Sequence, residues 1–308
     1  MSIEAKIHRI RRARWSSCYD MGMPAIVGIH GIAQQYTGGN ELRAQWLPAL
    51  KDGLTVAGHR EVSDALRDED LRVSFFGNLF RPKGAMGTDF PPYTAANLTE
   101  KGEIDLLTDL YDQAVTLQPE LGPPVGALGG PLVPVQVMIE RLLRSRTFAK
   151  LIPERAFVGN LKQVIRFLTD TAVKEEVLAR VHGEIDDNTR VLIGHSLGSV
   201  VAYEYLCHHR PAGVKLLVTL GSPLGIRNVV FDRLTPTPGA WPAAVSRWVN
   251  VADPNDVVAL RKDLAELFPP PAGIDPVGDR LVDNGPTPHG IRPYLTAAET
   301  GDALAAVL

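Results

Sequence analysis

The chain has 308 residues, of which 45% are hydrophobic and 22% charged, and its formal net charge at pH 7 is −3. These values exclude wholesale disorder, and they give no reason to expect nucleic acid or an anionic membrane as a partner. The two cysteines are too few for a disulfide framework or a cysteine-rich metal site, so a reducing cytoplasm is the expected location.

Residues 1–23 are basic and lack the apolar core of a secretory signal. We expect a solvated tail or an upstream extension here, followed by one domain over 24–308. No apolar run approaches the length of a membrane-spanning helix, so stable membrane insertion is not expected.

The regular pattern begins with "PAIVGIHGI" (24–32), a short apolar run that predicts a buried strand ending in a tight turn. A helical spacing of apolar residues follows over 40–58, and a second strand is predicted over 71–80. Strands that alternate with helices indicate a parallel sheet buried on both faces.

Residues 81–153 are rich in proline and glycine and contain one clear helical pattern. We interpret them as a cap inserted into the domain. The apolar stripe of that helix, from Val135 through Met138 to Leu143, either packs on the sheet or contacts an apolar substrate at the opening of the site.

Alternation then resumes to the end of the chain. The expected elements are a helix over 161–185, a strand over 190–194, a helix over 197–209, strands over 214–223 and 246–253, and a helix over 294–308. The predicted fold class is therefore α/β, with a doubly wound, mainly parallel sheet and an inserted cap.

The run "GHSLG" places Ser196 between Gly194 and Gly198, exactly where a strand is expected to pass into a helix. Packing glycines beside a helix-capping serine would explain it without chemistry. The context instead resembles the nucleophile elbow of the α/β-hydrolase family, in the form common among its lipases and esterases. The resemblance covers residues 24–308 without the cap, and it implies that Ser196 is a nucleophile.

A serine nucleophile needs a general base, and in this family the acid and then the histidine follow the serine along the chain. Three of the eight histidines do so. His208 and His209 lie near the far end of the helix that begins at the serine, more than ~15 Å away. Elimination leaves His289, on a proline- and glycine-rich loop before the last helix.

The acid is predicted within "WVNVADPNDVVALRKDL". Alignment with the family's lipases favours Asp256, while Asp253 is the second choice and is otherwise a turn former before proline. Asp283 is a more distant alternative. The acid would orient the imidazole and stabilise its protonated form.

The resemblance also implies two oxyanion donors, the backbone N–H groups of Leu197 and Ile32. His30 and Gly31, in the matching loop, and His195, beside the serine, are candidate substrate-binding residues together with Met138. For His30 a structural hydrogen bond is the favoured alternative.

The expected function is a serine hydrolase that cleaves a carboxylic ester of a small-molecule or lipid-like acyl substrate. The same triad could run acyl transfer, thioester hydrolysis or amide hydrolysis, and the scaffold could also be a non-catalytic binding module. Nucleotide-phosphate and common zinc motifs are missing from the sequence, and a serine triad needs no cofactor or metal.

Overall fold

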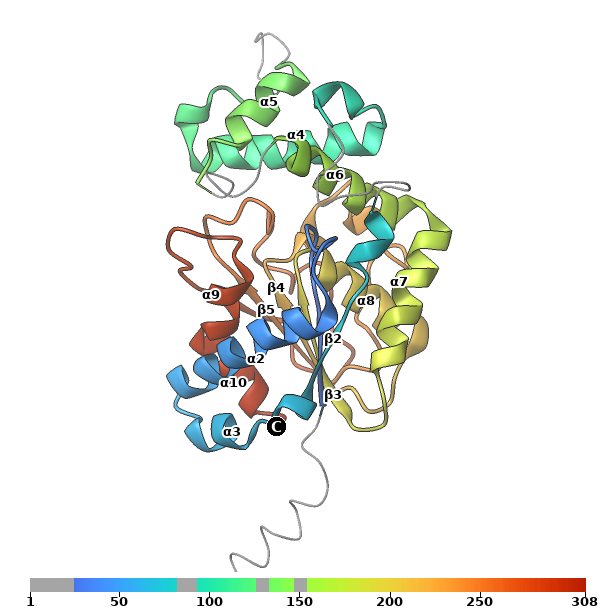
Figure 1. The fold of residues 1–308 in the computed structure, drawn as a ribbon, viewed down its shortest axis with the longest axis vertical. Coiled ribbons are helices and arrows are strands. Elements are labelled where there is room, and N and C mark those ends of the chain that lie inside the picture. The colour runs from blue at the N-terminus through green and yellow to red at the C-terminus, as the bar shows by residue number, and fades with distance from the viewer. Residues whose placement is uncertain (1–24, 82–92, 126–132, 147–153) are drawn as a thin grey trace, which may run out of the picture.

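A computed structural model describes residues 25–81, 93–125, 133–146 and 154–308 of the protein. The predicted tail, 1–23, and parts of the predicted cap, 81–153, lie outside these residues. In the described part, six parallel strands form a sheet in the order β2-β1-β3-β4-β5-β6 (Figure 1). The strands are β1 (Ala25–Ile29), β2 (Leu71–Ser74), β3 (Thr189–His195), β4 (Leu216–Leu220), β5 (Arg247–Ala252) and β6 (Gly278–Leu281). The prediction of an α/β fold with a parallel sheet is confirmed.

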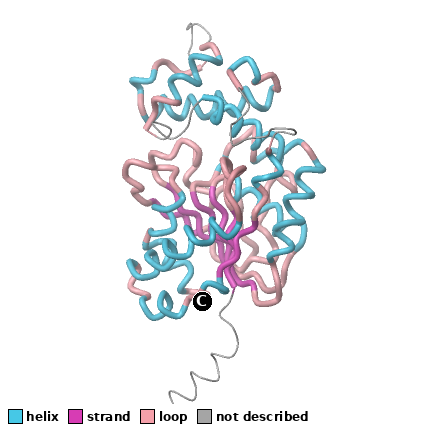
Figure 2. The backbone as a smooth tube through the Cα atoms, viewed as in Figure 1, coloured by secondary structure: helices cyan, strands magenta, loops and turns pink. Residues whose placement is uncertain are grey.

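Helices cover both faces of the sheet (Figures 1 and 2). One side carries α2 (Gly39–Val56), α3 (Arg60–Ala65), α9 (Ile291–Thr296) and α10 (Ala298–Ala305), and the other carries α7 (Thr171–Glu184) and α8 (Leu197–His209). Neighbouring side chains of a strand point to opposite faces. In β3, Val191 and Ile193 therefore join the core beneath α2, while Leu192 joins the core beneath α8.

Two of the predicted helices are interrupted. The pattern over 161–185 belongs to two helices, α6 (Glu154–Thr169) and α7, because the carboxylate of Asp170 accepts a hydrogen bond from the N–H of Val173 at 3.2 Å and caps a new helix. The pattern over 294–308 is split between α9 and α10 at Ala297, whose backbone is extended.

The predicted cap contains a second helix that the sequence analysis did not identify, α4 (Lys101–Leu117), in addition to α5 (Val135–Leu142). Buried Leu106, Leu110 and Ala114 lie four residues apart on one side of α4, so the helix buries an apolar stripe. Strand β6 was also not predicted, because only one of its residues, Leu281, is apolar and it is exposed.

Helices α4, α5 and α6 form what we call the helical layer, which lies beyond the carboxyl ends of the strands (Figure 1). A buried ion pair joins two of them. The Glu103 carboxylate of α4 lies 2.7 Å from the Lys162 ammonium of α6, and it also accepts the N–H groups of Thr99 and Glu100 at the start of α4. The pair fixes the relative position of the two helices.

The apolar stripe of α5 packs against α4 rather than against the sheet. Met138 is 2% exposed, and Ile139 and Leu142 are fully buried. The Arg141 guanidinium donates a hydrogen bond to the Tyr111 hydroxyl of α4 at 2.6 Å. The stripe is therefore core of the helical layer.

We expect Met138→Asp to destabilise the helical layer, because it buries a carboxylate that has no charge partner, at a cost of about 3–5 kcal/mol. Met138→Leu, which nearly conserves volume, should cost less than about 1.5 kcal/mol. Urea unfolding, with hydrogen exchange on α4 and α5, measures both. Equal unfolding midpoints for the two variants would contradict this packing.

Candidate active site

Ser196 occupies the sharp turn between β3 and α8. Its backbone has φ 53° and ψ −127°, a conformation that costs a non-glycine residue on the order of 1–3 kcal/mol. The N–H of Ser196 donates to the carbonyl of Leu220 on β4 at 3.0 Å, which ties the strained turn to the sheet. Because of this turn, Ser196 belongs to neither β3 nor α8, and it lies at the carboxyl edge of the sheet.

The two flanking glycines allow this turn to pack closely. A Cβ atom at Gly198 would collide with the carbonyls of Ile29 and His30 at the end of β1, and one at Gly194 would lie 2.5 Å from the carbonyl of Gly198. A Cβ at Gly31 would lie 2.9 Å from the Cβ of Ser196. The glycines therefore fit both interpretations of the motif. They let the backbones pack closely, and this close packing also places the serine on a sharp turn.

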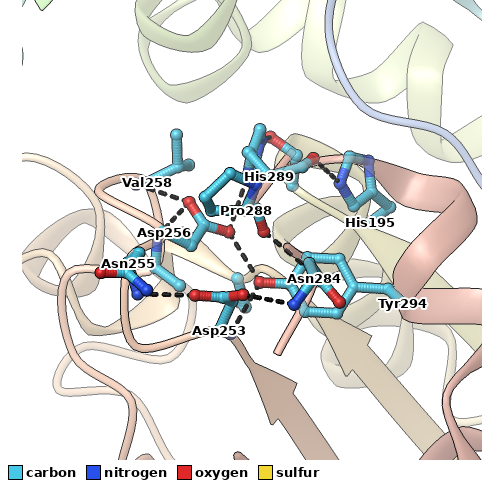
Figure 3. Close-up of polar contacts among 12 residues, drawn as sticks. His195, Asp253, Asn255, Asp256, Val258, Asn284, Pro288, His289 and Tyr294 are labelled. Carbon is cyan, nitrogen blue, oxygen red and sulfur yellow. Dashed lines mark hydrogen bonds and ion pairs between the residues drawn. The ribbon is translucent and has the colours of Figure 1, made fainter. Parts of the chain in front are cut away.

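The structure brings Ser196, His289 and Asp256 together from three separate segments. The Nε2 atom of His289 lies 3.0 Å from the Ser196 hydroxyl oxygen. Its Nδ1 atom lies 2.8 Å from Oδ2 of Asp256, in the loop after β5 (Figure 3). With Nδ1 protonated and donating to the carboxylate, Nε2 presents its lone pair to the hydroxyl.

Asp256 is completely buried and accepts several hydrogen bonds. Oδ2 also accepts from the Tyr294 hydroxyl at 2.8 Å, and Oδ1 accepts from the N–H groups of Val258 and Ala259 at 2.9 and 3.4 Å. Burial by itself would raise the pKa of Asp256, but its charge and hydrogen-bond interactions with His289 and the bond from Tyr294 hold that pKa below its usual range. The carboxylate is therefore ionised.

Asp253, the second choice for the acid, is equally buried but does not contact His289. Its two oxygens accept the backbone N–H groups of Asn255 and Asn284, each at 2.6 Å (Figure 3). Asn284 in turn donates its side-chain amide to the carbonyl of Pro288 at 2.9 Å. Asp253 thus shapes the loop that carries His289, while Asp283 is exposed and caps a local turn.

His195 supports the same loop through a hydrogen bond to its backbone. Its Nε2 atom lies 3.0 Å from the backbone carbonyl of His289, so Nε2 carries the proton and donates it (Figure 3). Burial, together with the nearby His289, lowers the pKa of His195 to about 3. His195 is therefore neutral and holds the backbone of His289, and it is not among the residues that line the cavity described below.

His30 forms two structural hydrogen bonds. Its Nδ1–H donates to the carbonyl of Gly31 at 2.6 Å, and its Nε2 accepts the N–H of Phe76 at 3.1 Å. Burial lowers the pKa of His30 to about 4, so the ring is neutral. Both ring nitrogens are used within the protein, which agrees with the structural alternative for this residue.

The backbone N–H groups of Leu197 and Ile32 have no acceptor among the described residues. Leu197 is the first residue of α8, where the leading N–H groups lack partners within the helix, and both residues border the same cavity as Ser196. The two donors are thus available to an oxygen atom bound beside the serine.

A small cavity of about 60 Å³ covers the Ser196 hydroxyl. Segments that follow the strands form one side of this cavity, and α4 and α6 of the helical layer form the other side. Ser196 is 3% exposed, so this layer shields it. The lining residues are mostly apolar: Ile32, Leu106, Leu110, Phe157, Asn160, Leu161, Val164, Ser196, Leu197, Pro223, Ile226, Val258 and His289. Met138, expected as a contact, is not among them.

Several contributors to this site were not identified from the sequence. Tyr294 joins the Asp256 carboxylate to the N–H of Asp253, and its position within a helical pattern gave no signal of this. Gly221, which lies within the strand predicted over 214–223, directly follows β4, and a Cβ there would lie 2.8 Å from Asp256 Oδ2. The partly buried Lys262 ammonium donates to the carbonyl of Asp256 at 2.5 Å and neutralises charge near both aspartates.

Within the described ranges there is no group of three or more His, Cys, Asp or Glu side chains that could hold a metal ion. In the same part of the chain, no helix is long and apolar enough to cross a membrane. Comparison of the sequence and structure with protein-family models, curated proteins and solved structures gives no match. The geometry of the site therefore carries the functional argument.

The two neutral histidines predict how stability changes with pH. Unfolded, each titrates near 6.5, whereas in the folded protein the pKa is about 4 for His30 and about 3 for His195. The unfolded chain therefore binds more protons below pH 6.5, so the stabilisation is complete above that pH and is lost as the pH falls toward 4. Each histidine contributes a slope of about 1.4 kcal/mol per pH unit.

Urea unfolding between pH 7.5 and 5 measures this slope. His195→Gln keeps a side-chain donor but does not titrate. The free energy of unfolding of this variant should therefore change less steeply with pH, by the contribution of one histidine. A free energy of unfolding that stays level from pH 6.5 to 5 would show that these rings are not held neutral.

Proposed function

We propose that the protein is a serine hydrolase that cleaves a carboxylic ester. The observation that carries this proposal is the continuous hydrogen-bond chain from the Ser196 hydroxyl through the His289 imidazole to the Asp256 carboxylate, at 3.0 and 2.8 Å. The strained turn at Ser196 adds support, because such strain persists where the surrounding structure enforces it and is concentrated at functional sites.

In the proposed reaction the Ser196 oxygen attacks the ester carbonyl while His289 Nε2 takes the hydroxyl proton. The Asp256 carboxylate holds the ring in the required tautomer and stabilises the imidazolium. The N–H groups of Leu197 and Ile32 bind the oxyanion of the tetrahedral intermediate. His289 then protonates the leaving alcohol, and a water molecule, deprotonated by the same nitrogen, hydrolyses the acyl-enzyme.

We further propose that the chain belongs to the α/β-hydrolase family and that the helical layer is its cap. Two features support this. The serine, aspartate and histidine follow one another along the chain in the family's order, at the carboxyl edge of a parallel sheet. The layer of α4 and α6 forms one wall of the cavity above Ser196, as a specificity-determining cap would.

Ser196→Ala should lower kcat for p-nitrophenyl acyl esters by about a million-fold, because the nucleophile is lost and the other members cannot act without it. Ser145→Ala is the matched control. Ser145 is also a fully buried serine, but it lies at the end of α5 and its hydroxyl has no partner in the described part of the chain. Undiminished turnover by Ser196→Ala would refute the assignment.

A non-catalytic binding module with the same scaffold is the alternative of another class. A fluorophosphonate probe separates the two, because it labels a serine only when that serine is activated by its base. Labelling of the folded wild type that is lost in Ser196→Ala supports the hydrolase. Acyl transfer, thioester hydrolysis and amide hydrolysis use the same residues, and product analysis with competing alcohols, thioesters and amides distinguishes them.

The narrow cavity predicts a preference for short acyl chains, since about 60 Å³ holds only a few water molecules or a short alkyl group. Leu110→Ala widens this wall and should raise kcat/KM for hexanoate relative to acetate at least about tenfold. Leu107→Ala, on the same helix and fully buried but not lining the cavity, is the control. An unchanged chain-length profile in Leu110→Ala would place the acyl group elsewhere.

A further inference from the structure

The apolar cavity above Ser196 contains one polar side chain that the proposed mechanism does not use. Asn160 of α6 lines the cavity and is 5% exposed. Apart from Ser196 and His289, the other side chains that line it are apolar, over the described residues. An amide at this place needs an explanation, because an apolar residue would fill the wall at a lower cost of desolvation.

A neighbouring amide fixes the orientation of Asn160. Its Oδ1 atom accepts a hydrogen bond from Nε2 of Gln163, one turn along α6, at 3.3 Å, and Gln163 is itself 6% exposed. The Nδ2 group of Asn160 has no acceptor within the described ranges, yet it is not among the sealed polar atoms that lack a partner. Nδ2 thus keeps some accessible surface, and because Asn160 lines the cavity, we take this N–H group as an unused donor on the cavity wall.

In a narrow, mostly apolar space such a donor finds few water molecules, and a donor left without an acceptor there is unfavourable. An acceptor brought in by a bound molecule removes this penalty, and a site built in this way discriminates strongly against analogues that lack the acceptor. The acceptor must be uncharged, because the lining contains no lysine or arginine that could compensate a buried anion.

Resting on the proposed ester hydrolysis, we propose that Asn160 determines specificity by donating a hydrogen bond to a second, neutral oxygen of the substrate. The substrate class is then a short ester that carries an ether, keto or similar oxygen within a few bonds of the scissile carbonyl. The small volume of the cavity keeps this oxygen close to Ser196, because both residues border a space of only about 60 Å³.

Matched pairs of esters test this inference. p-Nitrophenyl methoxyacetate and p-nitrophenyl butanoate differ by one oxygen in the acyl part, and 2-methoxyethyl butanoate and butyl butanoate differ by one oxygen in the alcohol part. The measured quantity is the ratio of kcat/KM for the oxygen-containing ester to that for its alkyl partner. Comparing this ratio between wild type and variants cancels the intrinsic reactivities of the esters.

Asn160→Leu, of similar volume, should lower this ratio about tenfold in one of the two pairs. Val164→Ala is the control, because Val164 lies on the same helix and lines the same cavity but has no hydrogen-bonding group, so its ratio should stay within about twofold of wild type. If Asn160→Leu does not fold, Asn160→Ala serves instead and is compared with the same control.

The outcomes separate the two proposals. Ratios for the Asn160 variant within about twofold of wild type in both pairs, with hydrolysis that still depends on Ser196, would overturn the role of Asn160 and leave the proposed function standing. If wild type hydrolyses none of the four esters in a Ser196-dependent way, the proposed function fails and the role of Asn160 fails with it.

Discussion

The contact between the start of α8 and the end of β1 sets the geometry on which the candidate site depends. At Gly198 the helix backbone approaches the carbonyls of Ile29 and His30 so closely that no Cβ fits between them. This approach forces the strand-to-helix turn to be tight, and the tight turn places Ser196 in a conformation that a free chain would avoid. It also places the first N–H of α8, from Leu197, near the loop after β1, which carries Ile32. These two residues supply the proposed oxyanion donors. One steric constraint therefore positions the hydroxyl and its donors together.

The remaining constraint is electrostatic, and it concerns two aspartates in one short loop. Both are buried beyond the end of β5, and each has a different set of donors. Asp256 faces the imidazole, whereas Asp253 holds the backbone that leads to it. Tyr294 links them by accepting from one and donating to the other. Burial also keeps His195 and His30 neutral, so neither ring adds a charge beside the pair of Asp256 and His289.

The sequence predicted those parts of the molecule that follow from local pattern and chain order. Apolar runs identified β1 to β5, although β2 ends at Ser74 and not at residue 80 as predicted, and the glycine spacing around Ser196 located the turn. It could not reveal contacts between distant segments, such as Tyr294 with Asp256, because a single tyrosine in a helical pattern has no signature. The break at Asp170 was missed because apolar periodicity continues across it, although an N-capping aspartate is a local signal. The stripe of α5 was recognised, but periodicity does not say which surface a stripe covers, and here it covers α4.

The helical layer also determines how rigidly the space beside Ser196 is enclosed. Ser196 is 3% exposed, and side chains of α4 and α6 line the cavity that it borders. The partly buried ion pair between Glu103 and Lys162 joins those two helices, so we expect them to move together. Collective movements of packed helices of this kind take place in microseconds to milliseconds. One ion pair between two helices therefore sets how rigidly the wall of the cavity is held.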